Sequence, residues 1–197
     1  NQLFENLGDG IFDDITKDSG ADDRGYGMGV AAGDYDNDGD IDLYVTNLGP
    51  NTLLRSEGNG KFTDVTKSAG VGEPSWSASA VFFDYDRDGD LDLYVSNLGF
   101  PNLLHRNDGH GIFRQVAEAV ELRRPGASVA AFPAGYDNDG DPDIYVCNDF
   151  WSPDRIWIND GTGRFQAISK LSIRHTSKFT MGVDFSDIDR DGDLDFL

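Results

Sequence analysis

The sequence has few basic residues and no long apolar run. Its 197 residues contain 16 lysines and arginines against 36 aspartates and glutamates, so the formal net charge is −20. This charge argues against nucleic acids and anionic membranes as partners, because both repel an acidic surface. No apolar stretch approaches the ~18 residues of a membrane span, and no signal peptide is visible. We therefore expect no nucleic-acid binding and no direct insertion into a membrane.

The chain also has a single cysteine. Cys147 lies in the apolar run DIYVCN and has no second cysteine in the chain to pair with, so we expect a small buried side chain. A single cysteine does not indicate whether the protein occurs in an oxidising or a reducing compartment. Disorder is the other reading of a strongly acidic chain, but 38% hydrophobic and 12% aromatic residues argue against it.

Aspartate is abundant, and it recurs in loops at nearly constant spacing. The loops begin at Asp34, Asp84, Gly135 and Asp187, which are 50, 51 and 52 residues apart. We call them loop 1 (34–42), loop 2 (84–92), loop 3 (135–143) and loop 4 (187–195), and number their positions 1 to 9. Small and apolar residues precede each loop, and LYVTN, LYVSN or IYVCN follows the first three. A second apolar segment, a Gly-rich turn and a third apolar segment such as GKFTDVT complete the unit.

Each unit therefore predicts four short β-strands, with the Asp loop between the first two. Val, Ile, Phe and Tyr dominate the segments, and no stretch has a persuasive helical period; residues 116–123 come nearest. Four antiparallel strands recurring every 40–50 residues or so are typical of a β-propeller blade, and a solenoid of stacked repeats is the alternative. We predict an all-β fold, with residues 1–197 forming one partial β-propeller domain of four-stranded antiparallel blades.

The ends of the chain fall inside units. The first sixteen residues repeat the third and fourth segments, and the chain stops within a second strand. Three full blades therefore lie between two complementary half blades. A four-blade ring closed by pairing of the termini is conceivable. We favour a part of a larger propeller, because an open fragment exposes sheet edges.

The aspartates predict cation sites. Close carboxylates repel by roughly 4 kcal/mol per pair at an effective dielectric near 20, so such a string must be fully solvated or must surround a cation. Aspartates at positions 1, 3, 5 and 7 with glycine at 6 resemble the first half of a calcium loop. Oxygen donors without His or Cys favour calcium or magnesium, and the flexible shell of calcium suits a crowded loop better. An EF-hand is excluded, because position 12 is a valine within a strand instead of a glutamate.

In this scheme position 9 completes the shell with a bidentate carboxylate, and position 7 contributes its backbone oxygen while its side chain faces solvent. We expect about three to four Ca²⁺ ions, one per loop, with the weakest in loop 3, where Gly135 replaces the first ligand. The predicted ligands are Asp34, Asp36, Asp38, Asp40 and Asp42; Asp84, Asp86, Asp88, Asp90 and Asp92; Asp137, Asp139, Asp141 and Asp143; and Asp187, Asp189, Asp191, Asp193 and Asp195.

The strand–DxDxDGxxD–strand unit, seen in GMGVAAGDYDNDGDIDLYV and FTMGVDFSDIDRDGDLDFL, resembles the FG-GAP/VCBS repeat of the integrin α-subunit amino-terminal propeller. In detail it is most similar to the cartilage-acidic-protein (ASPIC/UnbV-type) family. The resemblance implies a seven-bladed ring in the intact protein, calcium loops on one rim, and an extracellular or cell-surface location, or a periplasmic one in a bacterium. It implies no particular ligand.

A calcium-stabilised binding or adhesion module is the favoured function. A carbohydrate-active propeller enzyme (lyase or glycosidase) and a purely structural subunit of a larger complex are the alternatives. The chain is not expected to be an enzyme, because its acidic clusters repeat in one kind of turn instead of converging on one pocket. Longer connectors reach the rim opposite the Asp loops, so we expect a protein or glycan partner there. The candidate contacts are Arg123, Arg124, Trp151 and Trp76, although the aromatic residues could instead fill gaps between blades.

Overall fold

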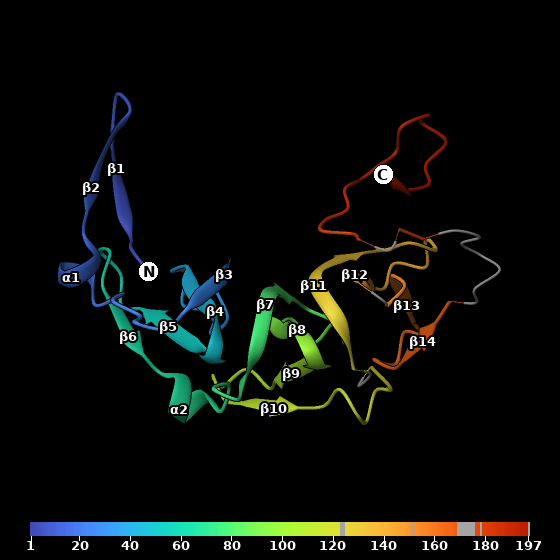
Figure 1. Cartoon of the computed structure of the whole chain (residues 1–197), viewed down its shortest axis with the longest axis horizontal. Coiled ribbons are helices and arrows are strands. Elements are labelled where there is room, and N and C mark those ends of the chain that lie inside the picture. Colours follow the sequence, from blue (N-terminus) through green and yellow to red (C-terminus); the bar gives the residue numbers. More distant parts are fainter. Residues whose placement is uncertain (123–124, 151, 169–175, 178, 197) are drawn as a thin grey trace.

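The computed structural model describes residues 1–122, 125–150, 152–168, 176–177 and 179–196 (Figure 1). These residues form three four-stranded blades. Blade A contains β3 (Gly27–Gly33), β4 (Asp42–Pro50), β5 (Thr52–Ser56) and β6 (Phe62–Asp64). Blade B contains β7 (Pro74–Phe83), β8 (Asp92–Pro101), β9 (Leu103–Asn107) and β10 (Phe113–Gln115). Blade C contains β11 (Pro125–Ala134), β12 (Asp143–Asn148), β13 (Arg155–Asn159) and β14 (Phe165–Ala167).

Within each blade, strands that follow one another in sequence pair antiparallel. Each Asp loop joins the first strand of a blade to the second, because the strand that follows loops 1 to 3 begins at position 9. The predicted fold class, an all-β propeller built of four-stranded antiparallel blades, is confirmed. The number of blades in a ring stays a prediction, as does the assignment of all 197 residues to one domain.

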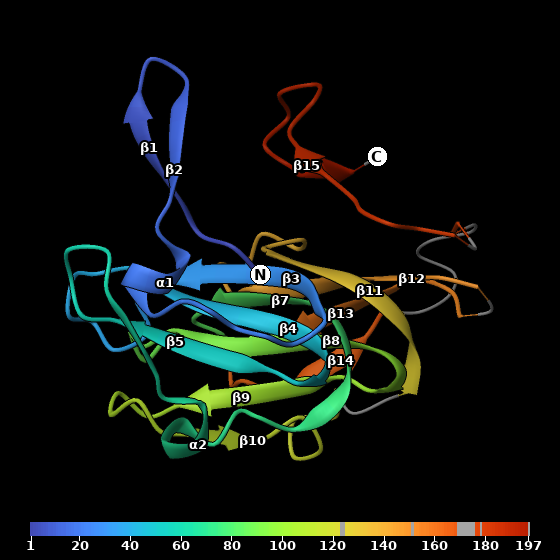
Figure 2. The ribbon, with the colours of Figure 1, turned by 60° about the vertical axis from the view of Figure 1, so that its left-hand side comes forward.

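The two half blades form separate two-stranded sheets. Strand β1 (Phe4–Gly8) pairs with β2 (Ile11–Asp14), and β15 (Phe185–Ser186) pairs with β16 (Asp195–Phe196). Both hairpins project from the same side of the three blades (Figures 1 and 2). They do not pair with each other, so the four-bladed closure considered from the sequence is not formed.

Neighbouring blades are joined by backbone pairing that the sequence did not predict. The end of β4 runs past its own blade and pairs with the start of β7, with Leu48 opposite Trp76. The end of β8 pairs in the same way with β11, where Leu98 lies opposite Ala127. The three blades therefore belong to one twelve-stranded sheet, and their relative positions are set by the backbone as well as by side-chain packing.

The hydrophobic core lies between blades. One cluster packs Tyr44 and Leu53 of blade A against Leu93 and Val95 of blade B. The next packs blade B against blade C, and a third packs blade C against Val183 and Phe185 of the C-terminal segment. The lone Cys147 is buried in that third cluster, where burial raises the pKa of its thiol to about 12. The expectation of a small buried side chain is confirmed.

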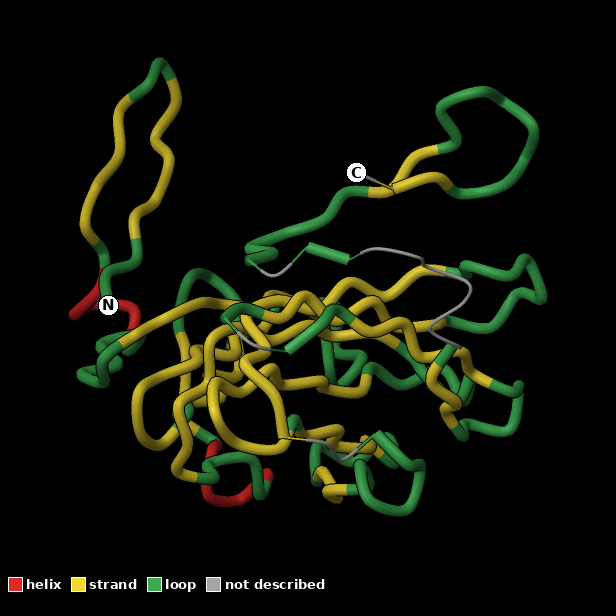
Figure 3. The backbone as a smooth tube through the Cα atoms, turned by 45° about the vertical axis from the view of Figure 1, so that its right-hand side comes forward, coloured by secondary structure: helices red, strands yellow, loops and turns green. Residues whose placement is uncertain are grey.

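Two single helical turns were not predicted. Helices α1 (Thr16–Ser19) and α2 (Thr66–Ala69) follow the last strand of a unit and are red in Figure 3. The N-cap residues, Ile15 and Val65, supply no side-chain hydrogen bond, but the aspartate before each of them, Asp14 or Asp64, accepts the backbone N–H of the first helical threonine at 3.0 Å. Four residues are too few for the period of a helix to show in a sequence. Within residues 116–123, the nearest helical candidate, residues 117–121 form turns, and residue 123 lies outside the described residues. None of the described helices has the length and apolarity needed to span a bilayer.

Candidate metal loops

The first residue closes each complete Asp loop with both of its carboxylate oxygens. In loop 1, Oδ1 of Asp34 accepts the backbone N–H of Asp38 at 3.1 Å, and Oδ2 accepts that of Gly39 at 3.0 Å. Loops 2 and 4 repeat both bonds at 3.0–3.1 Å. Glycine at position 6 has a φ of 94° in loops 1 and 2 and 98° in loop 4, which L-residues rarely adopt. The turn expected at this glycine is present.

In loops 1 and 2 the ninth residue is held inside the blade. Asp42 and Asp92 are fully buried, because position 9 is also the first residue of β4 or β8. Oδ2 of Asp92 accepts the N–H of Tyr85 at 3.0 Å, and Oδ1 accepts that of Asn107 at 2.8 Å. Asp42 makes the same pair of bonds to the backbone of Tyr35 and Ser56. Two backbone donors therefore hold each of these carboxylates in place.

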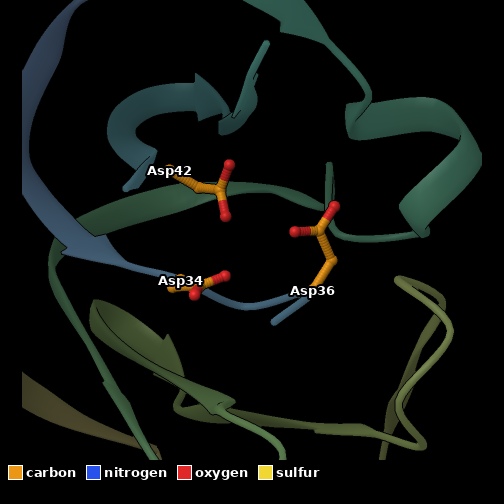
Figure 4. Close-up of side chains that lie close together, drawn as sticks. All are labelled: Asp34, Asp36 and Asp42. Atoms are coloured by element: carbon orange, nitrogen blue, oxygen red, sulfur yellow. The ribbon is translucent and has the colours of Figure 1, made fainter. Parts of the chain in front are cut away.

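Positions 1, 3 and 9 converge in three loops. Single carboxylate oxygens of Asp34, Asp36 and Asp42 lie within 4.8 Å of one another, and Figure 4 shows these side chains facing a common centre. Two of them come from the loop and the third from the start of β4. The same grouping occurs in loops 2 and 4. Its members are Asp84, Asp86 and Asp92, and Asp187, Asp189 and Asp195.

One oxygen in loops 1 and 2 has no partner. Oδ1 of Asp36 and Oδ1 of Asp86 are buried and accept no hydrogen bond from the described residues. An unsatisfied buried carboxylate oxygen costs free energy, so its place is explained if it ligates a cation. The donors around it are all carboxylate oxygens, which suit Ca²⁺. The side chains at positions 1, 3 and 9 therefore fit a calcium ion.

Burial makes the negative charges of these loops costly. It raises the pKa of Asp42 to about 6 and that of Asp92 to about 8, against the lowering effect of their backbone hydrogen bonds. The pKa values of Asp36 and Asp86 are raised as well, first by burial and next by the neighbouring carboxylate at position 5. A cation among these carboxylates would favour their charged forms.

Positions 5 and 7 lie outside the three groups. In all four loops, Oδ1 of the fifth residue accepts the backbone N–H of the seventh at 2.9–3.0 Å. The side chain at position 7 was expected to face solvent, and that holds for Asp40 and Asp193. It is wrong for Asp90, which is half-buried, and for Asp141, which is buried. A side chain of the preceding loop contacts each of these two carboxylates, and the Gly turn of the same blade lies against it. The contact between blades cannot be read from one repeat of the sequence.

The seventh residue receives a hydrogen bond from the fourth residue of the preceding loop. Asn37 Nδ2 donates to Asp90 Oδ1 at 2.7 Å, and the guanidinium of Arg87 donates to Asp141 at 2.6 Å. The pair between loops 3 and 4 is Asn138 and Asp193, at 2.5 Å. The fourth residues were not singled out from the sequence. Their signal was there, because position 4 is asparagine or arginine in every loop.

Among the described residues, loops 1, 2 and 4 each have a group of three converging carboxylates, and loop 3 does not. Gly135 offers no side chain, and the N–H of Asp139 bonds to Asp137 instead, at 3.3 Å. The ninth residue, Asp143, still accepts two backbone N–H bonds, at 2.7 and 2.8 Å. The loop therefore keeps its frame but has fewer converging oxygens, and Arg87 brings a positive charge to it.

Comparison with known proteins identifies the repeat. A family model described as an FG-GAP-like repeat matches residues 1–45, 34–95 and 135–197. The chain belongs to the FG-GAP-like repeat family. It is 46% identical over 55 residues to cartilage acidic protein 1 of Xenopus tropicalis, which covers 27% of this chain and 8% of that protein.

Among solved structures, the FG-GAP-like chain is similar to an Agrocybe aegerita lectin solved for its recognition of non-reducing terminal N-acetylglucosamine. The TM-score is 0.47 at 18% identity, over 85% of this chain and 46% of the lectin. The chain thus spans less than half the length of each of these two relatives.

Of the four predicted contact residues, Trp76 lies among the described residues. It is near the start of β7, at the end of this strand away from loop 2, and 39% of its surface is exposed. Arg123, Arg124 and Trp151 lie outside the described residues. Other exposed apolar side chains of the FG-GAP-like units lie at the same ends of their strands or just beyond them. They are Leu48, Phe100 and Phe150.

Proposed function

We propose that this FG-GAP-like chain is a calcium-binding β-propeller module, without enzymatic activity, of an extracellular or cell-surface protein. Loops 1, 2 and 4 each hold one Ca²⁺, and loop 3 holds a fourth more weakly. The rim opposite these loops binds a protein or glycan partner. The family and the similarity to a cartilage protein support the location.

One observation carries the calcium proposal. In loops 1 and 2 a buried carboxylate oxygen without a hydrogen bond, on Asp36 or Asp86, lies in a group of three converging carboxylates. A solvated acidic turn would leave such an oxygen in water. The groups recur at the same three positions of loop 4. The ion would supply the positive charge, while the protein supplies fixed oxygens and a turn closed by position 1.

The same geometry argues against catalysis by the loops. Each group repeats one kind of turn, whereas an active site brings different groups to one substrate. The carboxylates at positions 1 and 9 already accept two backbone N–H bonds each, which holds them in place. We expect no turnover of polysaccharide substrates by the purified chain, in the presence or absence of calcium.

Calcium binding is tested by isothermal titration of the EDTA-stripped chain. We expect at least two ions with dissociation constants near 10⁻⁴–10⁻³ M, the range of extracellular modules. Asp36→Asn and Asp86→Asn should each remove one of them. Asp13→Asn, on the exposed face of β2, is a matched control and should remove none. No heat of binding at several millimolar calcium, or an unchanged stoichiometry in both loop variants, would refute the proposal.

Exposed apolar side chains support a partner on the opposite rim. Leu48, Trp76, Phe100 and Phe150 are 39–51% exposed, and Leu48 and Trp76 lie opposite each other on neighbouring strands. Exposed apolar side chains that gather at one end of a fold often mark an interaction surface. Trp76→Ala should weaken binding on a glycan array, or to a purified protein partner, and leave the calcium titration unchanged. Asp86→Asn should remove one calcium ion from the titration and leave partner binding unchanged. If binding survives Trp76→Ala and fails with the loop variant, the partner contacts the calcium loops instead.

A further inference from the structure

Loops 1 and 2 are joined by a side-chain hydrogen bond between neighbouring blades. Asn37, at position 4 of loop 1, donates from Nδ2 to Oδ1 of Asp90, at position 7 of loop 2, 53 residues away. Asn37 is not a predicted ligand. The bond is 2.7 Å long and joins two residues of neighbouring blades.

The donor depends on the turn of loop 1. Asn37 has a left-handed φ of 58°, which asparagine tolerates better than most residues. The next two residues, Asp38 and Gly39, donate their backbone N–H groups to Asp34. The direction of the Asn37 side chain is therefore set by the arrangement of carboxylates that would surround the ion in loop 1.

The acceptor belongs to the shell of loop 2. The backbone N–H of Asp90 bonds to Oδ1 of Asp88 at 3.0 Å, and its carbonyl is the predicted ligand of position 7. The other carboxylate oxygen lies against the Gly turn of blade B, where a Cβ added to Gly109 would come within 2.5 Å of Oδ2. Asp90 is thus confined between its own blade and Asn37.

From these contacts we infer that Asn37 couples calcium binding in loop 1 to calcium binding in loop 2. An ion that orders the turn of loop 1 fixes Asn37, and Asn37 then holds the seventh residue of loop 2 in place. The second ion pays less of the ordering cost, so the two sites bind cooperatively. Linkage requires the effect to be reciprocal. This inference rests on the proposed function and concerns loops 1 and 2, because loop 3 has no group of three carboxylates.

The test follows each site separately in a calcium titration by ¹H–¹⁵N NMR. The amides of Gly39 and Gly89 donate to the first aspartates of their loops, so each reports on its own site. In the native chain we expect Hill slopes above 1 for both, and Asp36→Asn in loop 1 should raise the calcium midpoint of Gly89 by about fivefold, within the usual range of coupling.

The decisive variant is Asn37→Gly, which keeps the left-handed turn and removes the bridging amide. In this variant both slopes should fall to 1, and adding Asp36→Asn should no longer move the midpoint of Gly89. Asn59→Gly is the control, because Asn59 is also left-handed, with a φ of 55°, but lies exposed in the Gly turn of blade A. It should leave the slopes unchanged.

Two results overturn the inference, and they differ from failure of the proposed function. Slopes of 1 in the native chain show independent sites, and slopes above 1 that persist in Asn37→Gly show coupling by another route. If neither glycine amide responds to calcium, the calcium sites themselves are refuted. The slopes in Asn37→Gly are decisive even if Asp36→Asn fails to fold.

Discussion

The side-chain amide of Asn107 donates a 2.7 Å hydrogen bond to the backbone carbonyl of Tyr35, which lies 72 residues earlier in the neighbouring blade. The backbone N–H of Asn107 simultaneously holds Asp92, at position 9 of loop 2. One residue therefore fastens loop 2 to loop 1. Asn159 repeats the arrangement one blade later, with a 2.8 Å bond to the carbonyl of Tyr85.

This bond gives the first prediction. Asn107→Ser keeps the backbone donor to Asp92 but removes the amide that satisfies the buried carbonyl of Tyr35. Serine is the native residue at the corresponding place in blade A, Ser56, so the backbone accepts it. We expect a loss of about 1–3 kcal/mol in the free energy of unfolding, the cost of an unsatisfied buried group. Urea denaturation followed by tryptophan fluorescence measures it.

The control for this prediction is Gln166→Ser, which removes an amide from an exposed position on β14. It should change the unfolding free energy by less than about 0.5 kcal/mol. Equal losses in the two variants would show that the bond between Asn107 and Tyr35 adds nothing to stability.

The second prediction concerns removal of the ion. Without calcium, carboxylates at positions 1, 3 and 9 face one another unneutralised in three loops. A ligand that binds only the folded chain stabilises it by about 1.4 kcal/mol for each site at ten times its dissociation constant. EDTA should therefore lower the melting temperature and millimolar calcium raise it, and Asp36→Ala should reduce the difference. Identical midpoints with chelator and with calcium would contradict the prediction.

Much of the fold could be predicted from the sequence, because its information is local and repeated. Strands rich in Val, Ile, Phe and Tyr and turns marked by glycine define each unit, and the aspartates at positions 1, 3 and 9 indicate the converging group. The ranges LYVTN and LYVSN fall within β4 and β8. Repetition converts a weak motif into a specific one, since chance rarely places it between strands again at the same spacing.

The contacts between units could not be predicted in the same way. Asn37 and Asp90 lie in different repeats. Because all units have the same periodicity, the sequence does not show which residues of neighbouring units contact one another. The pairing of Leu48 with Trp76 depends on how far β4 runs past its own blade. The helical turn at Thr66–Ala69 is shorter than the period by which helices are recognised. What was missed is therefore mostly the geometry between repeats.

The third prediction restores the missing ligand of loop 3. Gly135 does not have a left-handed φ, and a Cβ added to it would lie 3.5 Å from the carbonyl oxygen of Asp141, an ordinary contact. Gly135→Asp should therefore fit without strain, take up the role of Asp34 in closing the turn, and tighten calcium binding in this loop. Titration calorimetry of the variant should show one additional ion, or a stronger last site.

Gly135→Ala is the matched control, since it adds the Cβ without the carboxylate, and it should leave calcium binding unchanged. In the native chain, Asp137→Ala should cost less calcium-dependent stability than Asp36→Ala or Asp86→Ala. Equal losses in these three variants would contradict the ranking of the loops.

The last prediction comes from a histidine that lies apart from the loops. His105 on β9 is fully buried, and neither ring nitrogen has a hydrogen-bond partner in the described part of the chain. Its Nε2 lies 3.5 Å from Oε2 of Glu73. Burial lowers the pKa of His105 to about 4 and raises that of Glu73. The residues at the equivalent position of blades A and C are Leu54 and Trp157, so the other two blades have an apolar side chain where blade B has His105.

The sign of the pH effect follows from these values. The pKa of an unfolded histidine is near 6.5, so between about pH 6.5 and 4 the unfolded chain binds a proton that the folded chain does not. Stability should therefore fall as the pH is lowered through this window, by at most about 3 kcal/mol from this residue.

His105→Leu, which places the residue of blade A at this position, should lose this contribution and become progressively more stable than the native chain towards pH 4. Urea denaturation at a series of pH values in saturating calcium measures the difference, with His110→Leu, at an exposed turn, as the control. If the native and His105→Leu curves run parallel, the folded chain takes up the proton as readily as the unfolded one, which would mean that the half-exposed Glu73 carboxylate stabilises a protonated His105.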